Sequence, residues 1–399
     1  MTARRQVRDR AARVLMVLDG PYPSDRGGGA EAQVGLLSAA MRTRGQAVTV
    51  VTPMTIGGPM APVSRVAGVP VCRLRYPRIR WLGGPCLWLV LAMFLHARRR
   101  HYDVWHVHVA RSLATVCALL GPLLGKRVVI KVSGSWDLEQ GALAADPSLS
   151  GRIVRRCLRR ADAWQAISRR IAATLARRGM PGERIAEIPN AVDSDATGAG
   201  PRHVRDDDRI RLVFVGRLVE EKDLPTLLRA FSDVVATAPR LQLTIVGSGP
   251  LEDALIALAD ELALGARVSF TGHLDEVRPV LANADIGVLP SRFEGLSNSL
   301  LECMAARLPM IASRISGNED FVRHGENGWL FEPGDRAGLT AVLRAAAATD
   351  AATRAAMGAS ARETVIRQAG VDAVLRRLRS VYEGRQADAP VPGAIERSH

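Results

Sequence analysis

Residues 212–247, LVFVGRLVEEKDLPTLLRAFSDVVATAPRLQLTIVG, contain the pattern from which the fold can be predicted. Two short apolar runs, 212–215 and 241–246, flank a segment, 224–236, in which apolar residues recur at the spacing of a helix. A strand, a helix and a second strand in this order predict two parallel strands joined by a crossover helix.

The same alternation runs along most of the chain. Before residue 193 it predicts strands at 14–18, 47–52, 104–109, 128–132 and 163–167, and a helix at 30–43. After residue 208 it predicts strands at 268–270, 286–289 and 310–312, and helices at 251–262, 300–306, 339–348, 351–367 and 371–382. Two such runs predict an α/β protein of two doubly wound, Rossmann-like domains facing a cleft.

Residues 193–208 form a break, because this stretch is rich in Asp, Gly and Pro and has no apolar period. The chain has 399 residues, 47% hydrophobic and 4% aromatic, which suits two domains with aliphatic cores. We therefore predict an N-terminal domain at 1–192, a linker at 193–209 and a C-terminal domain at 210–368. A helix at 369–385 is predicted to pack back on the N-terminal domain, and a tail at 386–399 to be disordered.

Charge is distributed unevenly between the two halves. Residues 1–190 contain 30 Lys and Arg against 11 Asp and Glu (+19), and residues 191–399 contain 24 against 29 (−5), which sum to the total of +14. The basic half favours an anionic membrane surface or an anionic acceptor as its partner. Nucleic acid is disfavoured, because the sequence has no zinc-finger, RRM or helix-turn-helix signature. Solvated charge in an Arg-rich chain is the plainer alternative.

The five scattered cysteines and the lack of a secretory signal favour a reduced, cytoplasmic protein. Residues 81–95 are strongly apolar but too short for a membrane span, which needs about 20 residues. They predict either a buried helix or a helix at a membrane interface beside Arg98, Arg99 and Arg100. The second alternative would place the protein at the cytoplasmic face of a membrane.

The strongest chemical signal lies between residues 289 and 331. A strand at 286–289, a loop at 290–295 and a helix at 300–306 predict that backbone N–H groups of residues 296–299 point at a ligand. Glu294 precedes the helix and Glu302 lies about two turns along it. Either carboxylate alone would be read as a cap or a surface acid, but both also suit sugar and ribose hydroxyls.

A second signal is Gly216-Arg217-Leu218-Val219-Glu220-Glu221-Lys222, which follows one strand and precedes a helix. Arg217 and Lys222 are therefore predicted to converge on an anion at the carboxyl end of the sheet. A solvated loop pair is the alternative for these two alone. The chain has only three lysines, Lys126, Lys131 and Lys222, which favours a specific need for an ammonium group here.

Together these motifs resemble those of the retaining glycosyltransferases of family 4 (GT4), which have the two-domain GT-B fold. The resemblance extends over about residues 14–385. It rests on Glu294-x7-Glu302, on Gly216-Arg217 with Lys222, and on three further segments: Gly28-Gly29-Ala30-Glu31, DVWHVH at 103–108, and Ser168 with IPNAVD at 188–193. Departures from the family pattern occur at Ala191, Cys303, Arg307 and within Ser316-Gly317-Asn318-Glu319-Asp320.

The resemblance implies an N-terminal acceptor-binding domain, a C-terminal domain for the nucleotide sugar, and these residue roles. Arg217 and Lys222 would neutralise the donor diphosphate, Glu294 would hold the transferred sugar, and Glu302 the ribose. Backbone groups of Gly295, Leu296 and Ser297 would touch the sugar, and Gly28 and Gly29 would let backbone approach phosphate or acceptor. His108 would contact the sugar near the reacting carbon. His106 lies two residues away on the same strand face and is expected to be packed.

The implied activity is hexosyl transfer with retention, in polysaccharide or glycoconjugate biosynthesis. The donor would be a nucleotide-diphospho-sugar, a UDP-sugar by preference, and the acceptor a glycan, lipid-linked or small-molecule hydroxyl. No cofactor or metal is expected, because Lys222, Arg217 and a helix start supply positive potential; Asp206-Asp207-Asp208 is read as a solvated linker segment. The alternatives are a sugar-nucleotide epimerase or a phosphorylase, a catalytically silent nucleotide-sugar binder or assembly subunit, and a nucleic-acid-binding protein.

Overall fold

The computed structural model describes residues 11–23, 28–55, 60–77, 79–134, 143, 148–193 and 208–385. The chain divides into two compact units. Unit 1 contains residues up to Ala191 and takes up the chain again from Val371, and unit 2 contains Val192–Gly370. Most of the predicted linker and the whole predicted tail at 386–399 lie outside the described residues.

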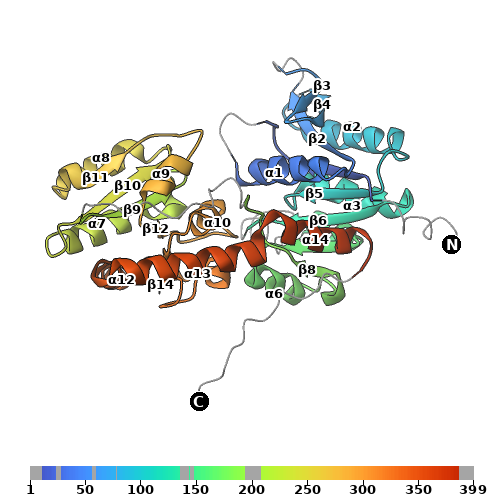
Figure 1. The fold of residues 1–399 in the computed structure, drawn as a ribbon. Coiled ribbons are helices and arrows are strands. Elements are labelled where there is room, and N and C mark those ends of the chain that lie inside the picture. The colour runs from blue at the N-terminus through green and yellow to red at the C-terminus, as the bar shows by residue number, and fades with distance from the viewer. Residues whose placement is uncertain are drawn as a thin grey trace. The chain divides into compact units, whose positions relative to one another are not determined.

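Unit 1 is built on an eight-stranded sheet in the order β3-β4-β2-β1-β5-β6-β7-β8 (Figure 1). All its neighbouring strands are parallel except β3, which pairs antiparallel with β4 at one edge. The strands are β1 (Val14–Leu18), β2 (Val48–Thr55), β3 (Val63–Val66), β4 (Val69–Tyr76), β5 (Val104–His108), β6 (Arg127–Val132), β7 (Ala163–Ala166) and β8 (Ile185–Glu187).

Helices cover both faces of this sheet. They are α1 (Gly29–Thr43), α2 (Gly83–Ala97), α3 (Ser112–Leu123), α5 (Leu149–Leu158), α6 (Arg169–Arg177), the short 3-10 helix η2 (Gly182–Arg184) and α14 (Val371–Tyr382). The step from β1 to β2 runs in the opposite direction across the sheet to the step from β5 to β6. Because such crossovers are right-handed, α1 and α3 lie on opposite faces. Helix α2 packs against α3 and β4, and α14 packs against α1 and β6.

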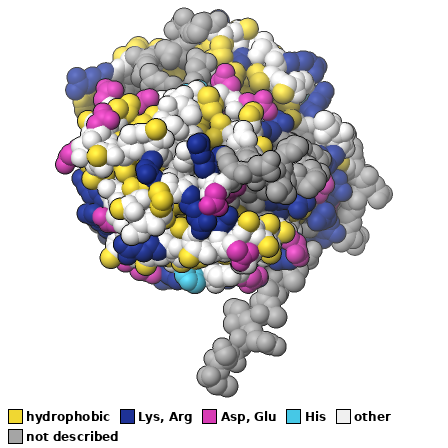
Figure 2. Space-filling view, turned by 60° about the vertical axis from the view of Figure 1, so that its left-hand side comes forward, with side chains coloured by type: hydrophobic (Ala, Val, Ile, Leu, Met, Phe, Trp, Pro, Cys, Tyr) yellow, Lys and Arg dark blue, Asp and Glu magenta, His cyan; other side chains and the backbone are white. Residues whose placement is uncertain are grey.

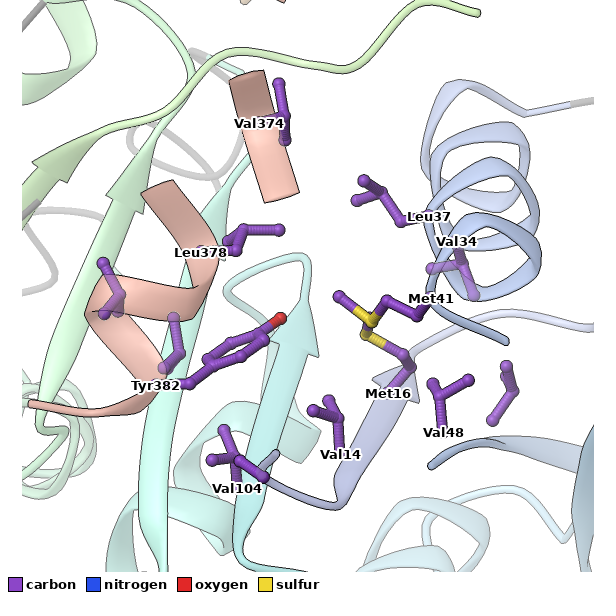
Figure 3. Close-up of a cluster of buried hydrophobic side chains, with 14 of the residues drawn as sticks. Val14, Met16, Val34, Leu37, Met41, Val48, Val104, Val374, Leu378 and Tyr382 are labelled. Carbon is purple, nitrogen blue, oxygen red and sulfur yellow. The ribbon is translucent and has the colours of Figure 1, made fainter. Parts of the chain in front are cut away.

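The core of unit 1 shows why α14 belongs to it. Alternate residues of β1, such as Val14 and Met16, face α1, as the period of two along a strand requires. Val374 and Leu378 of α14 and the aromatic ring of Tyr382 complete this cluster (Figure 3). Helix α14, the last helix among the described residues, therefore completes the core that contains β1.

Unit 2 has a six-stranded, fully parallel sheet in the order β11-β10-β9-β12-β13-β14. Its strands are β9 (Ile210–Val215), β10 (Leu241–Val246), β11 (Val268–Phe270), β12 (Ile286–Leu289), β13 (Met310–Ser313) and β14 (Gly328–Phe331). Its helices are α7 (Leu224–Val235), α8 (Glu252–Glu261), α9 (Arg278–Asn283), α10 (Asn298–Ala305), α11 (Asn318–Phe321), α12 (Arg336–Ala348) and α13 (Ala351–Ala369), with 3-10 turns η3 (Glu220–Lys222) and η4 (Gly265–Arg267).

The predicted α/β class with two parallel-sheet, Rossmann-like domains is confirmed. The predicted strands and helices all occur, with ends that differ by a few residues. Four strands (β3, β4, β8 and β14) and five α-helices (α3, α5, α6, α9 and α11) were not predicted. Residues 81–95, for which a buried or an interfacial helix was predicted, form α2 from Gly83, and no helix among the described residues could cross a bilayer.

Candidate active site

The candidate site of unit 2 lies at the carboxyl edge of its sheet. Because all six strands are parallel, the loops that follow them open at this one edge. Strands β9 and β12 are neighbours in the sheet although 70 residues separate them in sequence. Their pairing brings the loop after β9, with Arg217 and Lys222, beside the loop after β12, with Glu294.

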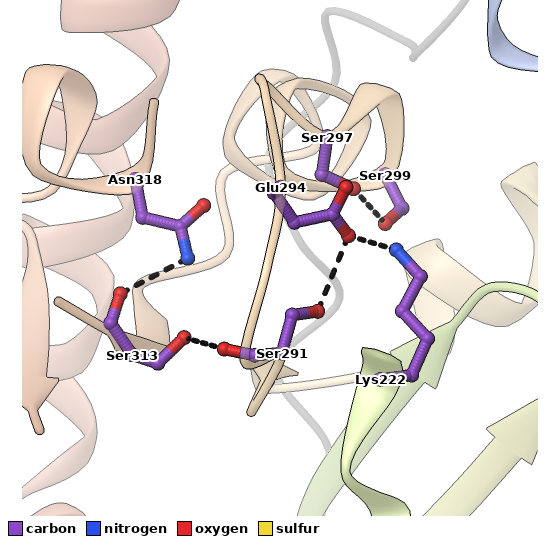
Figure 4. Close-up of polar contacts among 7 residues, drawn as sticks. All are labelled: Lys222, Ser291, Glu294, Ser297, Ser299, Ser313 and Asn318. Carbon is purple, nitrogen blue, oxygen red and sulfur yellow. Dashed lines mark hydrogen bonds and ion pairs between the residues drawn. The ribbon is translucent and has the colours of Figure 1, made fainter. Parts of the chain in front are cut away.

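Lys222 and Glu294 meet directly. The Lys222 ammonium donates to Glu294 Oε1 and forms an ion pair with it, and the two side chains are 15% and 16% exposed (Figure 4). Ser291 Oγ donates to the same carboxylate oxygen over 3.2 Å. The site therefore presents an ammonium and a carboxylate in contact, both still open to a ligand.

A row of hydrogen bonds fixes the backbone that carries Glu294. Ser313 Oγ donates to the Ser291 carbonyl over 2.5 Å, and Asn318 Nδ2 donates to the Ser313 carbonyl over 3.0 Å. Ser291, Ser313 and Asn318 are fully buried, so these bonds exchange little with water. Ser291 was missed as a site residue, because no sequence pattern marks a hydrogen bond between a loop serine and a carboxylate three residues later.

Arg217 and Arg292 differ in their partners. Arg217 is exposed, and its guanidinium makes no ion pair or hydrogen bond with the residues that the structure describes. Arg292 forms an ion pair with Asp223 over 2.9 Å, and its backbone N–H donates to the Glu221 carbonyl over 2.8 Å. Arg292 thus ties the two loops together, and Arg217 is the guanidinium that is available to a ligand.

The start of α10 follows Glu294 closely. Gly295, Leu296 and Ser297 are buried, and Ser297 is the N-cap residue but makes no side-chain cap. Its hydroxyl contacts Ser299 Oγ at 2.9 Å instead. Gly317 has φ of +82° and approaches this segment so closely that a Cβ would lie 2.5 Å from the Gly295 carbonyl oxygen. Gly317, the glycine of the Ser316–Asp320 segment, is thus required by packing.

Arg307, which departs from the family pattern, follows α10 with φ of +62°. This left-handed conformation favours glycine, and a side chain there is strained. Glycine, which is common at this position in the family that the sequence resembles, would adopt this conformation without strain. The departure affects the end of the helix and not Glu294 at its start.

Glu302 lies within α10, and burial raises its pKa from 4.5 to about 7. Between these two values the folded state keeps a proton that the unfolded state has released, so the free energy of unfolding falls as the pH rises. The fall amounts to roughly 3 kcal/mol for a shift of this size.

We expect Glu302→Gln to remove this pH-dependent loss of stability. As the pH rises from 4.5 to 7, the melting temperature of the variant should therefore rise relative to that of the wild type. Parallel melting curves at all pH values would contradict the buried, protonated carboxyl.

In unit 1, His106 and His108 share one strand face, as predicted, with ring centroids 4.4 Å apart. Both rings are fully buried. His106 Nδ1 and the Tyr382 hydroxyl are 2.7 Å apart, and His108 Nε2 lies 3.3 Å from Met16 Sδ. Burial lowers the pKa of His106 to about 3, with a further effect of the Lys131 charge, and lowers the pKa of His108 likewise. Both imidazoles are neutral at pH 7, and the contact of His108 with sugar stays a prediction.

The glycine loop before α1 packs against a side chain of its own helix. Gly28 is the N-cap of α1 and Gly29 its first residue. A Cβ on Gly28 would lie 1.9 Å from Glu31 Oε2, so the space beside this glycine is filled by the carboxylate of its own helix. Close approach of phosphate or acceptor to this backbone stays a prediction.

Grouped metal ligands do not occur in the described part of the chain: no three His, Cys, Asp or Glu side chains are placed together as a metal would require. Of the three linker carboxylates, Asp206 and Asp207 lie outside the described residues. Asp208 is exposed and lies 3.6 Å from Arg240.

Comparison with known proteins identifies two matching regions. Residues 209–348 match the family model described as "Glycosyl transferases group 1", and residues 27–196 match the model described as "Glycosyltransferase Family 4". The first region contains Arg217, Lys222, Glu294 and Glu302, and the second contains Gly28, Gly29 and His108.

Relatives of known activity and solved structures agree with these matches. The chain is 27% identical over 292 residues to the N-acetyl-alpha-D-glucosaminyl L-malate synthase of Bacillus anthracis, covering 72% of this chain and 76% of the relative. It is 28% identical over 326 residues to the 2-deoxystreptamine glucosyltransferase of Streptomyces kanamyceticus, covering 73% and 83%. The structure of Anabaena Alr3699/HepE in complex with UDP superposes with a TM-score of 0.72 at 18% identity over 92% of this chain and 98% of that one. At that identity the likeness shows the fold, which is GT-B.

Proposed function

The chain belongs to the group 1 glycosyltransferases of family 4, and on this premise we propose that it is a retaining hexosyltransferase that uses a nucleotide-diphospho-sugar. We propose UDP as the nucleotide, which agrees with the UDP bound to the structurally similar Anabaena protein. The acceptor would be a hydroxyl of a glycan, of a lipid-linked glycan or of a small molecule.

The contact between Lys222 and Glu294 is the observation that supports this proposal. Departure of a nucleoside diphosphate leaves negative charge on phosphate oxygens, which an ammonium stabilises in the transition state. A carboxylate accepts hydrogen bonds from sugar hydroxyls and so fixes the sugar that is transferred. A donor whose diphosphate meets Lys222 thus has its sugar beside Glu294. Arg217 adds a second positive charge from the same loop.

Retention at the anomeric carbon is proposed to proceed by attack from the same face, with the leaving phosphate taking the acceptor proton. No residue stands out in the sequence as a covalent nucleophile, and the resemblance to retaining glycosyltransferases implies retention. Glu302, with its pKa of about 7, can donate to or accept from a ribose hydroxyl at neutral pH.

We propose that transfer needs no metal ion, because Lys222, Arg217 and the start of α10 carry the positive potential. Turnover is therefore expected to be unchanged within error after exhaustive treatment with EDTA. The measurement is release of nucleoside diphosphate with and without added magnesium. Loss of turnover that magnesium restores would contradict the metal-free account.

A donor screen tests the function itself. Thermal-shift measurements with UDP-, GDP- and ADP-sugars should show stabilisation by one nucleotide series, and the same donor should be hydrolysed or transferred slowly. Stabilisation without any turnover in the presence of candidate acceptors would favour the second candidate, a catalytically silent nucleotide-sugar binder or assembly subunit. No stabilisation by any donor would refute both.

The acceptor class is proposed from the relatives. One relative is named for a malate acceptor and another for 2-deoxystreptamine, both small and hydroxylated. A third, at 36% identity over 173 residues, is a lipopolysaccharide core glycosyltransferase from Rhizobium meliloti of which the chain spans about half. Parallel assays with a polyhydroxy acid, an aminocyclitol and a lipid-linked glycan would separate these classes.

We also propose a cytoplasmic location. All five cysteines are free thiols, and three are only partly buried. Thiols of this kind stay reduced in the cytoplasm and would be open to oxidation outside it.

A further inference from the structure

Exposed hydrophobic side chains are concentrated on one part of unit 1. In the described part of the chain, twelve large hydrophobic side chains are exposed, and half of them come from α2 and the turn before it: Ile79, Trp81, Leu82, Trp88, Leu89 and Met93. Two more, Leu119 and Leu123, lie on α3, which packs beside α2. We call these eight residues the α2–α3 apolar surface.

Unit 2 differs in this respect. Only Ile256 and Phe293 of its described large hydrophobic side chains are exposed. Figure 2 turns the side of α7 and α8 forward, and hydrophobic side chains there lie in small groups among basic, acidic and polar ones. Scattered hydrophobic residues are normal on a protein surface, whereas a contiguous group marks an interaction site.

Helix α2 is apolar on both of its faces. Leu87, Leu91 and Leu95 are buried at the i, i+4, i+8 spacing and face the sheet. On the outer side Leu89 and Met93 are 61% and 55% exposed. The helix has no charged residue from Gly83 to Leu95, where a surface helix of a soluble domain normally carries its polar face. The inner side of α2 is thus buried, as the first sequence alternative predicted, and its outer side is apolar and exposed.

Positive charge borders this surface. Arg80 precedes α2, with its guanidinium 5.7 Å from the centre of the Trp81 ring, and Arg98, Arg99 and Arg100 follow the helix. From residue 79 to residue 134 the chain has eight Lys and Arg, and its one acidic residue, Asp103, is paired with Arg13 over 2.8 Å. Helix α5, which packs on α3, carries the exposed Arg152 and Arg156, and the exposed Arg159 follows it.

An anionic lipid bilayer matches this combination. Tryptophan is favoured at the level of lipid headgroups, aliphatic side chains enter the acyl boundary, and arginines reach anionic headgroups. Helix α2 has 15 residues, about 22 Å, and would lie in the membrane surface rather than across it. We propose that unit 1 docks on an anionic membrane surface through the α2–α3 apolar surface. This proposal is independent of the proposed transfer reaction, because its test measures binding to lipid vesicles and not turnover.

The experiment is flotation of the full-length chain with vesicles of phosphatidylcholine alone or with about a third phosphatidylglycerol. Wild type is expected to float with the anionic vesicles at low salt and less at high salt. The double variant L89Q/M93Q should lower the partition coefficient roughly tenfold or more for each side chain, since a buried side chain of this size changes partition by about that factor. Ile256→Gln, a matched change of an exposed residue on α8 in unit 2, should bind as wild type does.

Three outcomes would overturn the proposal. These are absence of wild-type binding to anionic vesicles at low ionic strength, equal binding by L89Q/M93Q, and equal loss of binding by Ile256→Gln. A second copy of the chain is the competing occupant, and sedimentation velocity without lipid tests it. A wild-type dimer that L89Q/M93Q converts to monomer would assign the surface to self-association instead. The melting temperature of each variant controls for folding, because both exchanged side chains point outward.

Discussion

Lys222→Ala is expected to lower the turnover number roughly 10²–10³-fold, or by about 3–4 kcal/mol of transition-state stabilisation. The reason is the place of the ammonium: it contacts Glu294 at the sheet edge and is the only lysine of unit 2. Release of nucleoside diphosphate at saturating donor measures the effect. A variant with wild-type turnover would remove Lys222 from the proposed mechanism.

The matched control for this prediction is Glu221→Ala. Glu221 is the exposed neighbour of Lys222 on η3, and its side chain makes no hydrogen bond or ion pair with the residues that the structure describes, while its backbone carbonyl accepts from the Arg292 N–H. The control should retain turnover and melting temperature. Lys222→Ala should retain its melting temperature as well, because Ser291 still donates to the Glu294 carboxylate.

A double-mutant cycle with Glu294→Ala sharpens the assignment. If both groups act on one bound donor in one step, the double variant should lose far less than the product of the two single losses. If the loss of turnover in the double variant equals the product of the two single losses, the two residues act independently. The contact between them would then be only structural.

Leu378→Ala is expected to destabilise unit 1 by about 2–5 kcal/mol, the usual range for removing a buried leucine side chain. Leu378 is fully buried in the core cluster, beside residues of α1 and β1 that lie more than 300 positions earlier in the chain. Thermal or urea unfolding would show the change, at about 2–4 °C in melting temperature per kcal/mol for a unit of this size.

Arg376→Ala serves as the control on the same helix. Arg376 is exposed, so its replacement should change the free energy of unfolding by less than about 0.5 kcal/mol. If Leu378→Ala is equally harmless, α14 is a loosely attached helix and not part of the core.

Local sequence patterns predicted the elements that have strong local signals. The β9-α7-β10 unit was predicted to within two residues, because its apolar periods and its bounding loops are all local. Helix α3 was missed because it is apolar on all sides and contains Gly121 and Pro122, so no helical period is visible. Strand β4 was missed because Pro70, Arg73 and Arg75 interrupt its alternation. Helix α6 did have a signal, the N-cap Ser168, whose hydroxyl accepts from the Ile171 N–H.

The candidate site was predictable by position but not by contact. In unit 2, Arg217, Lys222 and Glu294 lie in loops that follow predicted strands, and the rule for parallel sheets places these loops at one edge. That Lys222 touches Glu294, and that Arg292 is tied to Asp223, depends on β9 lying beside β12. Strand order across 70 residues is a long-range property, and no local pattern carries it.

The return of α14 to unit 1 has a consequence for biosynthesis. As the ribosome makes the chain, the whole of unit 2 emerges before Val374, Leu378 and Tyr382. Unit 1 therefore cannot complete its core before unit 2 has been synthesised, although its synthesis begins first. Until then the aliphatic core of unit 1 is exposed on one side, while unit 2 already folds. Until α14 has been synthesised, unit 1 must either be protected by a chaperone or persist in a partly folded state without aggregating.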